Sequence, residues 1–302
     1  MDEIKLPEYK IKETLGKVEI AGFTIGGDTS ISFMEEENNS GRALIAIEIP
    51  FFQDKNQNKV IEKAWGESVK DFETLFKKAE NTDADIICIE LNFDEERIKK
   101  ELESALKIIN STLKSTKKPL IIKGSGTKDY DNIVLPRFAK ELKKEVIIAY
   151  AEDDNYETII PPVIENNHIL VLRTPIDINL AKELSILSTE MGLKKDRILI
   201  DSEMGALGYG FDYAYSIIEK IREAAFSGDK MLSMPIITFV GDETFKTKET
   251  KTDNFPDSWG KLEQRAVMWE IATASAMISA GANIVVLSHP DSVKTLKETL
   301  WN

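Results

Sequence analysis

Two acidic residues follow a short apolar stretch in the second half of the chain. Residues 198–200 are aliphatic, and Asp201 and Glu203 come directly after them. If the strand continues that far, the two carboxylates share a direction, because side chains two positions apart lie on the same face. A second pair, Glu48 and Glu90, follows two other apolar stretches. Either pair has the chemistry for acid–base work, although acidic strand ends also cap helices and bind backbone amides.

Glycine-rich loops follow two of these stretches. Residues 205–210 read GALGYG, and a residue without Cβ lets the backbone approach a bound molecule closely. The alternative is that these glycines only shape a tight connection. The second loop, KGSGT from Lys123, superficially suggests phosphate binding, but it lacks the spaced glycines followed by Lys and Ser or Thr of a P-loop.

The sequence offers few residues for a metal site or a reactive thiol, and several catalytic motifs are missing. The single cysteine, Cys88, lies in the aliphatic run IICIEL and is most simply a reduced core thiol. One cysteine does not hold an iron–sulfur cluster, and with the distant His168 and His289 it does not form a conventional zinc site. His289, at a strand end, is the better site candidate of the two histidines. The nucleophile-elbow and dinucleotide-binding patterns are missing.

The elements that position these residues form a regular series. Eight near-continuous apolar runs rich in Ile and Val are typical of parallel strands covered on both faces. They are residues 43–49, 85–91, 119–123, 146–150, 169–173, 198–201, 236–240 and 284–287. Amphipathic segments follow them at 59–78, 94–113, 129–143, 156–166, 177–191, 211–226, 261–280 and 292–300. Eight strand–helix units predict an α/β fold, a (β/α)8 TIM barrel over residues 43–302. An open doubly wound sheet is the alternative.

Three further features complete this organisation. Residues 18–27 are predicted to be one strand ending in a glycine turn, which pairs with residues 31–36 in a hairpin-like N-terminal extension, residues 1–42, packed on the barrel. Residues 241–260 predict a long polar loop, a length typical of lids or docking surfaces. Function in such barrels lies at the carboxyl ends of the strands. The polar and ionisable residues there are Glu48, Glu90, Asn92, Lys123, Tyr150, Glu152, Asp153, Arg173, Thr174, Asp201, Glu203, Asp242, Glu243, Ser288 and His289.

Composition narrows the partners. The 302 residues include 39 basic and 52 acidic side chains, a net charge of −13. Such a charge argues against a nucleic-acid surface and an anionic membrane surface. The charged first residues lack the apolar core of a signal peptide, and every apolar stretch is too short to span a bilayer. We therefore expect a cytoplasmic protein.

Several stretches resemble a known family. The most specific are GALGYG (205–210), GDKMLSMPII (228–237) and AGANIVVLSHP (280–290). The segments KVEIAGFTIGGDTSISF (17–33) and ALIAIEIPF (43–51) fit as well, so the similarity spans most of the chain. The chain resembles the small subunit of the corrinoid iron–sulfur protein, whose archaeal equivalent is the delta subunit of the acetyl-CoA decarbonylase/synthase complex.

The resemblance implies a TIM barrel that covers a cobalamin-type corrinoid at the interface with a large subunit. The corrinoid is shared with that subunit, and the iron–sulfur cluster belongs to the large subunit only. The implied heterodimer accepts a methyl group from methyltetrahydrofolate through a separate methyltransferase. It then passes the methyl group to acetyl-CoA synthase in the reductive acetyl-CoA (Wood–Ljungdahl) pathway of carbon fixation in anaerobes. This chain is then a non-catalytic subunit of a methyl-carrier complex.

A corrin ring is broad and largely apolar, with amides at its rim, so it needs close backbone approach and hydrogen bonds. The glycine-rich loops at the barrel mouth are therefore the candidate corrinoid-facing residues. They are Gly205, Ala206, Leu207, Gly208, Tyr209 and Gly210, with Gly124, Ser125 and Gly126 as second choices. We assign neither a catalytic residue nor a metal ligand.

Two other functions stay open. One is a free-standing pterin-dependent methyltransferase that uses Asn92, Asp153 and Asp201; the other is a scaffold with a degenerate barrel mouth. An obligate partner interface should be apolar, so part of the aromatic set should lose exposure only in the complex. That set is Phe51, Phe52, Tyr209, Phe211, Tyr213, Phe245 and Trp259. Phe51 and Phe52, which follow Pro50, are the best candidates, unless the aromatics fill the layer between barrel and helices.

Overall fold

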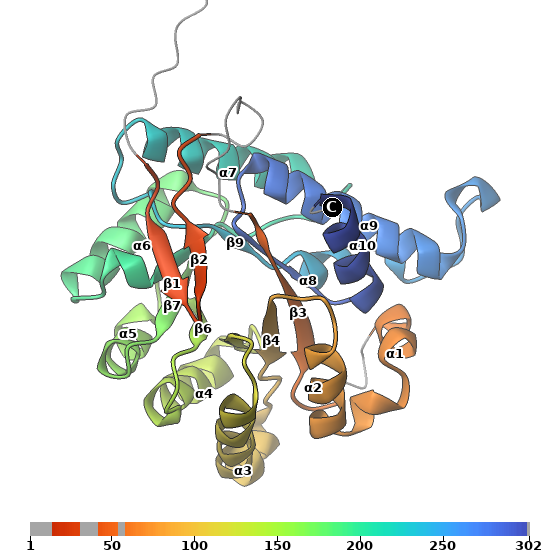
Figure 1. The fold of residues 1–302 in the computed structure, drawn as a ribbon, viewed down its shortest axis with the longest axis horizontal. Helices are drawn as coiled ribbons and strands as arrows, with labels where there is room; N and C mark the ends of the chain where they lie inside the picture. The colour runs from red at the N-terminus through yellow and green to blue at the C-terminus, as the bar shows by residue number, and fades with distance from the viewer. Residues whose placement is uncertain (1–13, 31–41, 54–57, 301–302) are drawn as a thin grey trace, which may run out of the picture.

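The computed structural model describes residues 14–30, 42–53 and 58–300. Eight parallel strands form one sheet that curls on itself, and the helices surround it (Figure 1). The strand order is β8-β7-β6-β5-β4-β3-β10-β9. The strands are β3 (Leu44–Pro50), β4 (Ile86–Glu90), β5 (Leu120–Lys123), β6 (Ile147–Ala151), β7 (Ile169–Arg173), β8 (Ile198–Asp201), β9 (Ile237–Thr238) and β10 (Ile284–Leu287).

The two end strands of this order, β8 and β9, meet and nearly close the ring. Ile200 and Ile236 form a parallel bridge between them, and the Ile200 amide donates to the Pro235 carbonyl at 2.9 Å. The predicted (β/α)8 barrel is confirmed, and the open doubly wound sheet is not what the chain forms. Strand β9 is shorter than the predicted run of residues 236–240, because Val240 already begins a short helix.

The outer helices follow the predicted series with two corrections. The bounds are α1 (Lys59–Trp65), η1 (Gly66–Lys70), α2 (Phe72–Glu80), α3 (Glu95–Ser115), α4 (Lys128–Glu141), α5 (Tyr156–Glu165), α6 (Ile178–Glu190), η2 (Lys195–Arg197), α7 (Phe211–Phe226), α8 (Val240–Thr244), η3 (Lys248–Thr250), η4 (Asp257–Trp259), α9 (Leu262–Ala280) and α10 (Pro290–Leu300). Within the described residues, no helix is both long and apolar enough to cross a membrane.

Both corrections have local causes. The single helix predicted over residues 59–78 is wrong, because Gly66 adopts φ +60° at the end of α1 and Asp71 caps α2 by accepting from the Thr74 amide at 2.8 Å. The loop predicted over residues 241–260 is also wrong: it starts within α8 and contains η3 and η4. Arg265 organises this segment by donating to the carbonyls of Glu249, Thr252 and Gly260.

Side-chain alternation along the strands creates two apolar layers. One set, including Ala46, Cys88 and Ile121, fills the barrel interior. The other set, including Ile47, Ile87 and Ile122, packs against the helices. Cys88 is fully buried, as predicted for a core thiol. The strands are apolar on both faces because both faces are covered.

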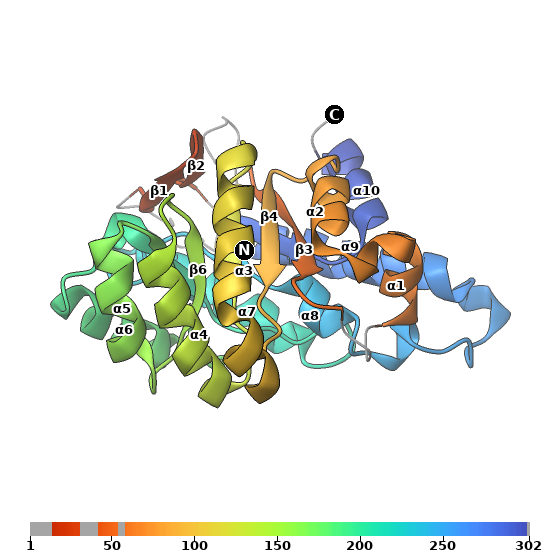
Figure 2. The ribbon, with the colours of Figure 1, turned by 90° about the horizontal axis from the view of Figure 1, so that it is seen from below.

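A β-hairpin covers the amino-terminal end of the barrel. Strands β1 (Lys17–Ile20) and β2 (Phe23–Gly26) are antiparallel, and Val18, Ile20 and Ile25 pack on the interior layer. In Figure 2 the β3 and β4 arrows point down, and the hairpin lies at the opposite, upper end of the barrel.

The N-terminal prediction needs one correction. A single strand over residues 18–27 is wrong, because Ala21 (φ 48°) and Gly22 (φ 85°) turn the chain back within it. The predicted pairing segment, residues 31–36, lies outside the described residues. The division of the chain at residue 42 into an extension and a barrel stays a prediction.

A buried arginine ties this end of the barrel together. Arg222 of α7 donates to the Gly281 carbonyl at 2.9 and 2.6 Å and binds the Asn283 side chain. The Asn283 amide donates in turn to Asp28, just beyond β2, at 2.9 Å. Burial lowers the pKa of Arg222 to about 10, with Asp28 acting against that shift, so this guanidinium remains charged at neutral pH.

Candidate functional site

Charged side chains fill the carboxyl end of the barrel because of strand alternation. Ala46, Cys88 and Ile121 point inward, so the residues two positions further along each strand, Glu48, Glu90 and Lys123, point inward too. Arg173 and Asp201 follow Val171 and Leu199 in the same way. The sequence places a charge at this step in five strands, so the mouth is polar although the interior below it is apolar.

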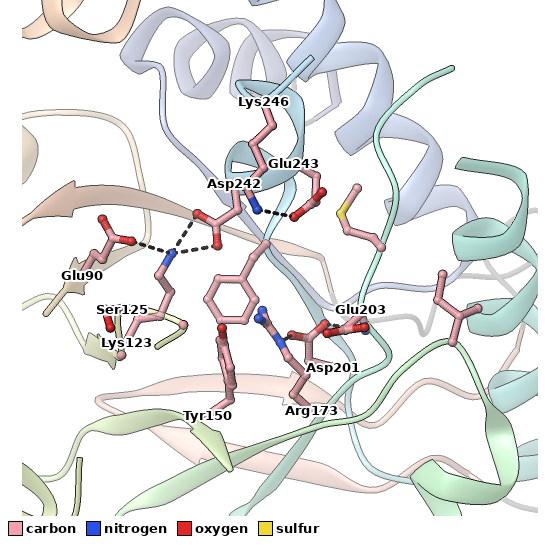
Figure 3. A pocket seen from close by; sticks show the side chains of 15 residues that line it. Glu90, Lys123, Ser125, Tyr150, Arg173, Asp201, Glu203, Asp242, Glu243 and Lys246 are labelled. Atoms are coloured by element: carbon pink, nitrogen blue, oxygen red, sulfur yellow. Dashed lines mark hydrogen bonds and ion pairs between the residues drawn. The ribbon is translucent and has the colours of Figure 1, made fainter. Parts of the chain in front are cut away.

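All of these charged side chains except Glu48 line an open cavity of about 470 Å³ (Figure 3). The lining residues are Glu90, Lys123, Gly124, Ser125, Gly126, Tyr150, Arg173, Ile176, Asp201, Glu203, Met204, Phe239, Asp242, Glu243 and Lys246. They come from the carboxyl ends of six of the eight strands and from the segments that follow them. The carboxyl end of the barrel is therefore the candidate functional site, as the fold predicts.

Lys123 is the centre of the first charge group. Its ammonium lies 2.7 Å from Asp242, 2.9 Å from Glu48 and 3.6 Å from Glu90, and its side chain is 2% exposed. Burial alone lowers the pKa of Lys123, but the carboxylates outweigh it and hold that pKa well above its usual value. The charged form of this ammonium is thus favoured in the folded protein.

The carboxyl groups around Lys123 differ in protonation. Burial, together with the nearby Asp242 charge, raises the pKa of Glu48 well above its usual range. Burial acts in the same direction on Asp242, but Lys123 outweighs it and the pKa of Asp242 is lowered. Between these two neighbours, the ionised form is therefore favoured on Asp242 and the protonated form on Glu48.

The three carboxyl groups lie within 4.8 Å of one another, and they form the single cluster of this kind across the described residues. The Lys123 ammonium lies among them, in the position that a bound cation would occupy. We therefore assign no metal site to this group. The predicted Glu48 and Glu90 pair is real in space, but both residues share Lys123.

Arg173 is the centre of the second charge group. Its Nε donates to Asp201 at 2.6 Å, and its guanidinium lies 3.3 Å from the centre of the Tyr150 ring. Burial raises the pKa of Asp201 even though Arg173 opposes it. Burial likewise raises the pKa of Tyr150 to about 12, so this phenol is neutral at physiological pH.

Asp201 and Glu203 do not act as the predicted carboxylate pair. Asp201 binds Arg173, and its second oxygen accepts from the Glu203 amide at 3.1 Å. The chain turns at Glu203, which has φ 52°, a conformation uncommon for a residue with a side chain. The strand has ended by then, so the two-residue alternation no longer applies.

The second-choice loop lies in the cavity wall. Gly124, Ser125 and Gly126 all line it, and the amides of Ser125 and Gly126 donate to the Asp131 carboxylate at 2.8 Å each. A Cβ on Gly124 would lie 2.5 Å from Asp131. The loop is wrapped around the protein's own carboxylate, which takes the place that an anionic ligand would need.

The first-choice loop, residues 205–210, lies outside this cavity lining. A Cβ on Gly205 would clash with the Tyr209 carbonyl, so a tight connection requires glycine there. Gly208 and Gly210 have φ +82° and +85°, and among the described residues no atom lies within 4 Å of a Cβ built on Gly208. Ala206 is buried and Tyr209 is exposed. The Leu207 carbonyl accepts from the Trp269 indole at 3.1 Å.

The histidines and Asn92 have structural partners. His289 is buried, stacks on Phe245, and accepts from the Asp291 amide at 3.1 Å. A ring nitrogen of His168 lies 2.9 Å from the Ala139 carbonyl. Asn92 exchanges two hydrogen bonds with the Phe52 backbone, at 2.9 and 2.8 Å, and so joins two loops.

The interface prediction is wrong for Phe51 and Phe245, whereas for the partly exposed Phe52 it stays a prediction. Phe51 and Phe245 are 7% exposed in this chain alone, so they have little exposure left to lose in a complex. Tyr209, Tyr213 and Trp259 are 47%, 67% and 46% exposed. Exposed aromatic surface therefore lies near residues 205–213 and 259.

A buried carboxyl group beside the mouth ties α9 to the end of β10. Glu270 accepts from the Ser288 amide at 2.6 Å and from the His289 amide at 3.3 Å. Burial raises the pKa of Glu270 to about 7 although these donors oppose the shift. Glu270 therefore titrates in the physiological range.

Comparison with known sequences gives one consistent result. The sequence model of a family described as "CO dehydrogenase/acetyl-CoA synthase delta subunit" matches residues 13–300. The acetyl-CoA decarbonylase/synthase complex subunit delta of Methanosarcina mazei is 29% identical over 283 residues, which cover 91% of this chain and 64% of the relative. The subunit delta of Archaeoglobus fulgidus is 32% identical over 202 residues, 64% of this chain and 44% of the relative. The chain thus matches less than two thirds of these relatives' length.

Solved structures with a similar fold include dihydropteroate synthases. The Yersinia pestis enzyme with a sulfonamide drug complex has a TM-score of 0.60 and 11% identity, covering 94% of this chain and 99% of that chain. The Coxiella burnetii enzyme in complex with pteroic acid has a TM-score of 0.56 and 15% identity, covering 86% and 92%. At these identities the likeness shows a shared barrel fold and nothing about ligands.

Replacing Lys123 by Met should destabilise the protein in a pH-dependent way. We expect the free energy of unfolding to fall by about 3–5 kcal/mol at pH 7.5, because a buried pair that loses one partner leaves uncompensated charge. Without the ammonium, the folded-state pKa values of the carboxyl groups rise, and groups with raised pKa values stabilise the fold at low pH. Urea unfolding should therefore show a smaller loss at pH 5. The exposed Lys246→Met is the control, with a change within about 0.5 kcal/mol; a Lys123→Met loss equal at both pH values would contradict the prediction.

Replacing Glu270 by Gln should flatten the pH dependence of stability. Because the folded-state pKa is about 7 and the ordinary value is 4.5, the stabilising contribution is complete below the ordinary value and is lost as pH rises through about 7. The wild type should lose up to about 3 kcal/mol between pH 5 and 8 from this group, and the neutral Gln should not. Thermal unfolding across that range measures the slope. Exposed Glu263→Gln, on the same helix, should keep the wild-type slope, and an unchanged slope in Glu270→Gln would refute the assignment.

Proposed function

The chain belongs to the CO dehydrogenase/acetyl-CoA synthase delta subunit family, and on that premise we propose that its barrel mouth covers one side of a corrinoid. In this proposal the corrinoid is of the cobalamin type and lies at the interface with a large subunit, which carries the iron–sulfur cluster. The named relatives are subunits of the acetyl-CoA decarbonylase/synthase complex, which supports a role within an assembly.

The charge pairing at the mouth carries this proposal. Lys123 is paired with Asp242, and Arg173 with Asp201, so the floor of the cavity is electrostatically satisfied before any ligand arrives. Side chains engaged with one another hold a surface in shape and are poorly placed to act as a nucleophile or base. This supports a subunit that binds and shields its ligand without doing covalent chemistry.

The size of the cavity supports a ligand lying across the mouth. A volume of about 470 Å³ is in the lower part of the range of about 300–1,000 Å³ for pockets that enclose drug-sized ligands. A corrin is wider than such ligands, so the barrel cannot enclose it. The rim would instead contact one face of the corrin ring. Glu90, Glu203 and Glu243 line the cavity, and their oxygens accept hydrogen bonds from amide N–H groups such as those on the corrin rim.

The candidate corrinoid-facing residues then have distinct parts. The loop at Gly208 and Tyr209 stands open beside the mouth and would lie against the corrinoid. Gly124, Ser125 and Gly126 would form the opposite wall. Bound corrinoid supplies the methyl-carrying cobalt, and the residues of this chain would bind it, orient it and exclude water.

The wider pathway follows from the same family. The heterodimer would receive a methyl group from methyltetrahydrofolate through a separate methyltransferase and pass it to acetyl-CoA synthase in the reductive acetyl-CoA pathway. In this scheme the chain contributes binding surfaces for the corrinoid and for partner subunits. The cytoplasm is the compartment in which we place this assembly.

A free-standing pterin-dependent methyltransferase is the second candidate. The cavity is large enough to enclose a bicyclic ring, and Tyr150 and Phe239 line it. Of the three predicted pterin contacts, however, only Asp201 lines the cavity among the described residues, while Asn92 binds the Phe52 backbone and Asp153 is exposed. Binding of methyltetrahydrofolate and transfer of its methyl group by the purified chain alone would favour this candidate over the first.

Replacing Gly208 by Trp should weaken corrinoid retention in the reconstituted heterodimer. A bulky side chain in the open space above the loop would push the corrinoid away, and we expect retention to weaken about tenfold, equivalent to about 1.4 kcal/mol. Cobalt content after gel filtration measures it. Gly228→Trp is the matched control, because Gly228 also has positive φ and an open Cβ position among the described residues, but lies after the far end of α7. Equal cobalt content in the two variants would remove residues 205–210 from the corrinoid face.

A further inference from the structure

From Gln264 onward, the outward face of α9 lacks the charged side chains that the other outer helices turn to solvent. Between Gln264 and Ala280 this fully described helix contains two charged residues, Arg265 and Glu270, and both are buried. A surface helix normally turns a charged face to solvent, as α3 does with Lys99 paired to Glu95 at 2.5 Å. The composition of α9 is therefore that of a helix covered on both sides.

The two charges between Gln264 and Ala280 serve the fold, whereas Glu263 in the first turn of α9 pairs with Lys63 of α1. Arg265 donates to three backbone carbonyls of the segment that precedes the helix. Glu270 accepts from the amides at the end of β10. The residues left at the outward surface, including Gln264, Met268 and Ala272, are uncharged.

An apolar groove runs beside this face. It has a volume of about 560 Å³ and is lined by Leu207, Trp259, Met268, Trp269 and Ala272 among others. Trp259 stacks on Trp269 with ring centres 5.9 Å apart, and Met268 is 58% exposed. Exposed apolar surface of this kind marks interaction sites, and Trp and Met are enriched in protein interfaces.

We infer that the outward face of α9 and this groove form the docking surface for a different subunit. Arg265 also lines the groove, but its guanidinium is already bound to three backbone carbonyls. Because the outward residues of α9 from Gln264 onward are uncharged, the partner must present an uncharged surface to avoid burying an unpaired charge. Ala272 and Ser275 are small enough to let a helix approach closely, and the groove accepts an aromatic or long aliphatic side chain. The occupant is thus an uncharged helix face with one large apolar anchor.

The occupant is a different chain and not a second copy. A net charge of −13 on each copy opposes self-association through long-range repulsion. The surface is also continuous with the proposed corrinoid face, since the Trp269 indole binds the Leu207 carbonyl in the 205–210 loop. The identity of the partner rests on the proposed function, whereas the existence of the docking surface does not.

The test uses the assembled heterodimer with the large subunit. Met268→Glu and Ala272→Glu place a charge on the outward face of α9, and Ser104→Glu places one on the exposed face of α3 as the control. We expect the first two variants to raise the dissociation constant at least about tenfold, a change of about 1.4 kcal/mol, and the control to leave it unchanged. Sedimentation equilibrium gives the constants. Thermal unfolding of each free chain identifies any variant that is misfolded.

Hydrogen exchange on the unmodified chain gives an independent readout. Amides of residues 259–280 should exchange more slowly in the heterodimer than in the free chain. Unchanged exchange and wild-type affinity in both α9 variants would overturn the inference. It would also fall if the free chain dimerised through this face and Ala272→Glu abolished the dimer. A heterodimer that depends on α9 but retains no cobalt would support this surface while refuting the proposed corrinoid role.

Discussion

One buried ammonium determines the form of the barrel mouth. Lys123 lies among Asp242, Glu48 and Glu90 with 2% of its side chain exposed, and three carboxyl groups this close together would repel one another without it. Its attraction holds the start of α8 against β3, β4 and β5. These strands lie far from α8 in the sequence. The open cavity keeps its shape because this one ammonium lies at ion-pair distance from all three carboxyl groups.

The barrel was accessible from the sequence because both faces of its strands are buried. Runs of Ile and Val continue without polar interruption, so β7, β8 and β10 could be predicted to the residue. The N-terminal hairpin was not, since the apolar alternation of residues 18–27 passes through the turn at Ala21 and Gly22 without a break. Gly66 likewise interrupts an amphipathic pattern that reads as one continuous helix.

The candidate site was harder to predict than the fold because it depends on contacts between distant residues. Lys123 and Asp242 are 119 positions apart, and each looks like a solvated strand end until the barrel brings them together. The alternation rule contained the missing signal, because a charge two residues beyond an inward apolar residue must also point inward. The glycine-rich loops were the predicted contacts instead, but close approaches within the protein itself account for Gly205 and Gly124.

The hairpin of β1 and β2 covers one end of the barrel and leaves the other end accessible. Val18, Ile20 and Ile25 extend an apolar interior that side chains already fill, so any ligand must approach the barrel at its carboxyl-end rim. A second polypeptide bound over that rim would block access, and the ligand could enter or leave only when this polypeptide moves away from the rim. The rate of ligand binding would then depend on how often the assembly opens, and the barrel itself would not need to change shape.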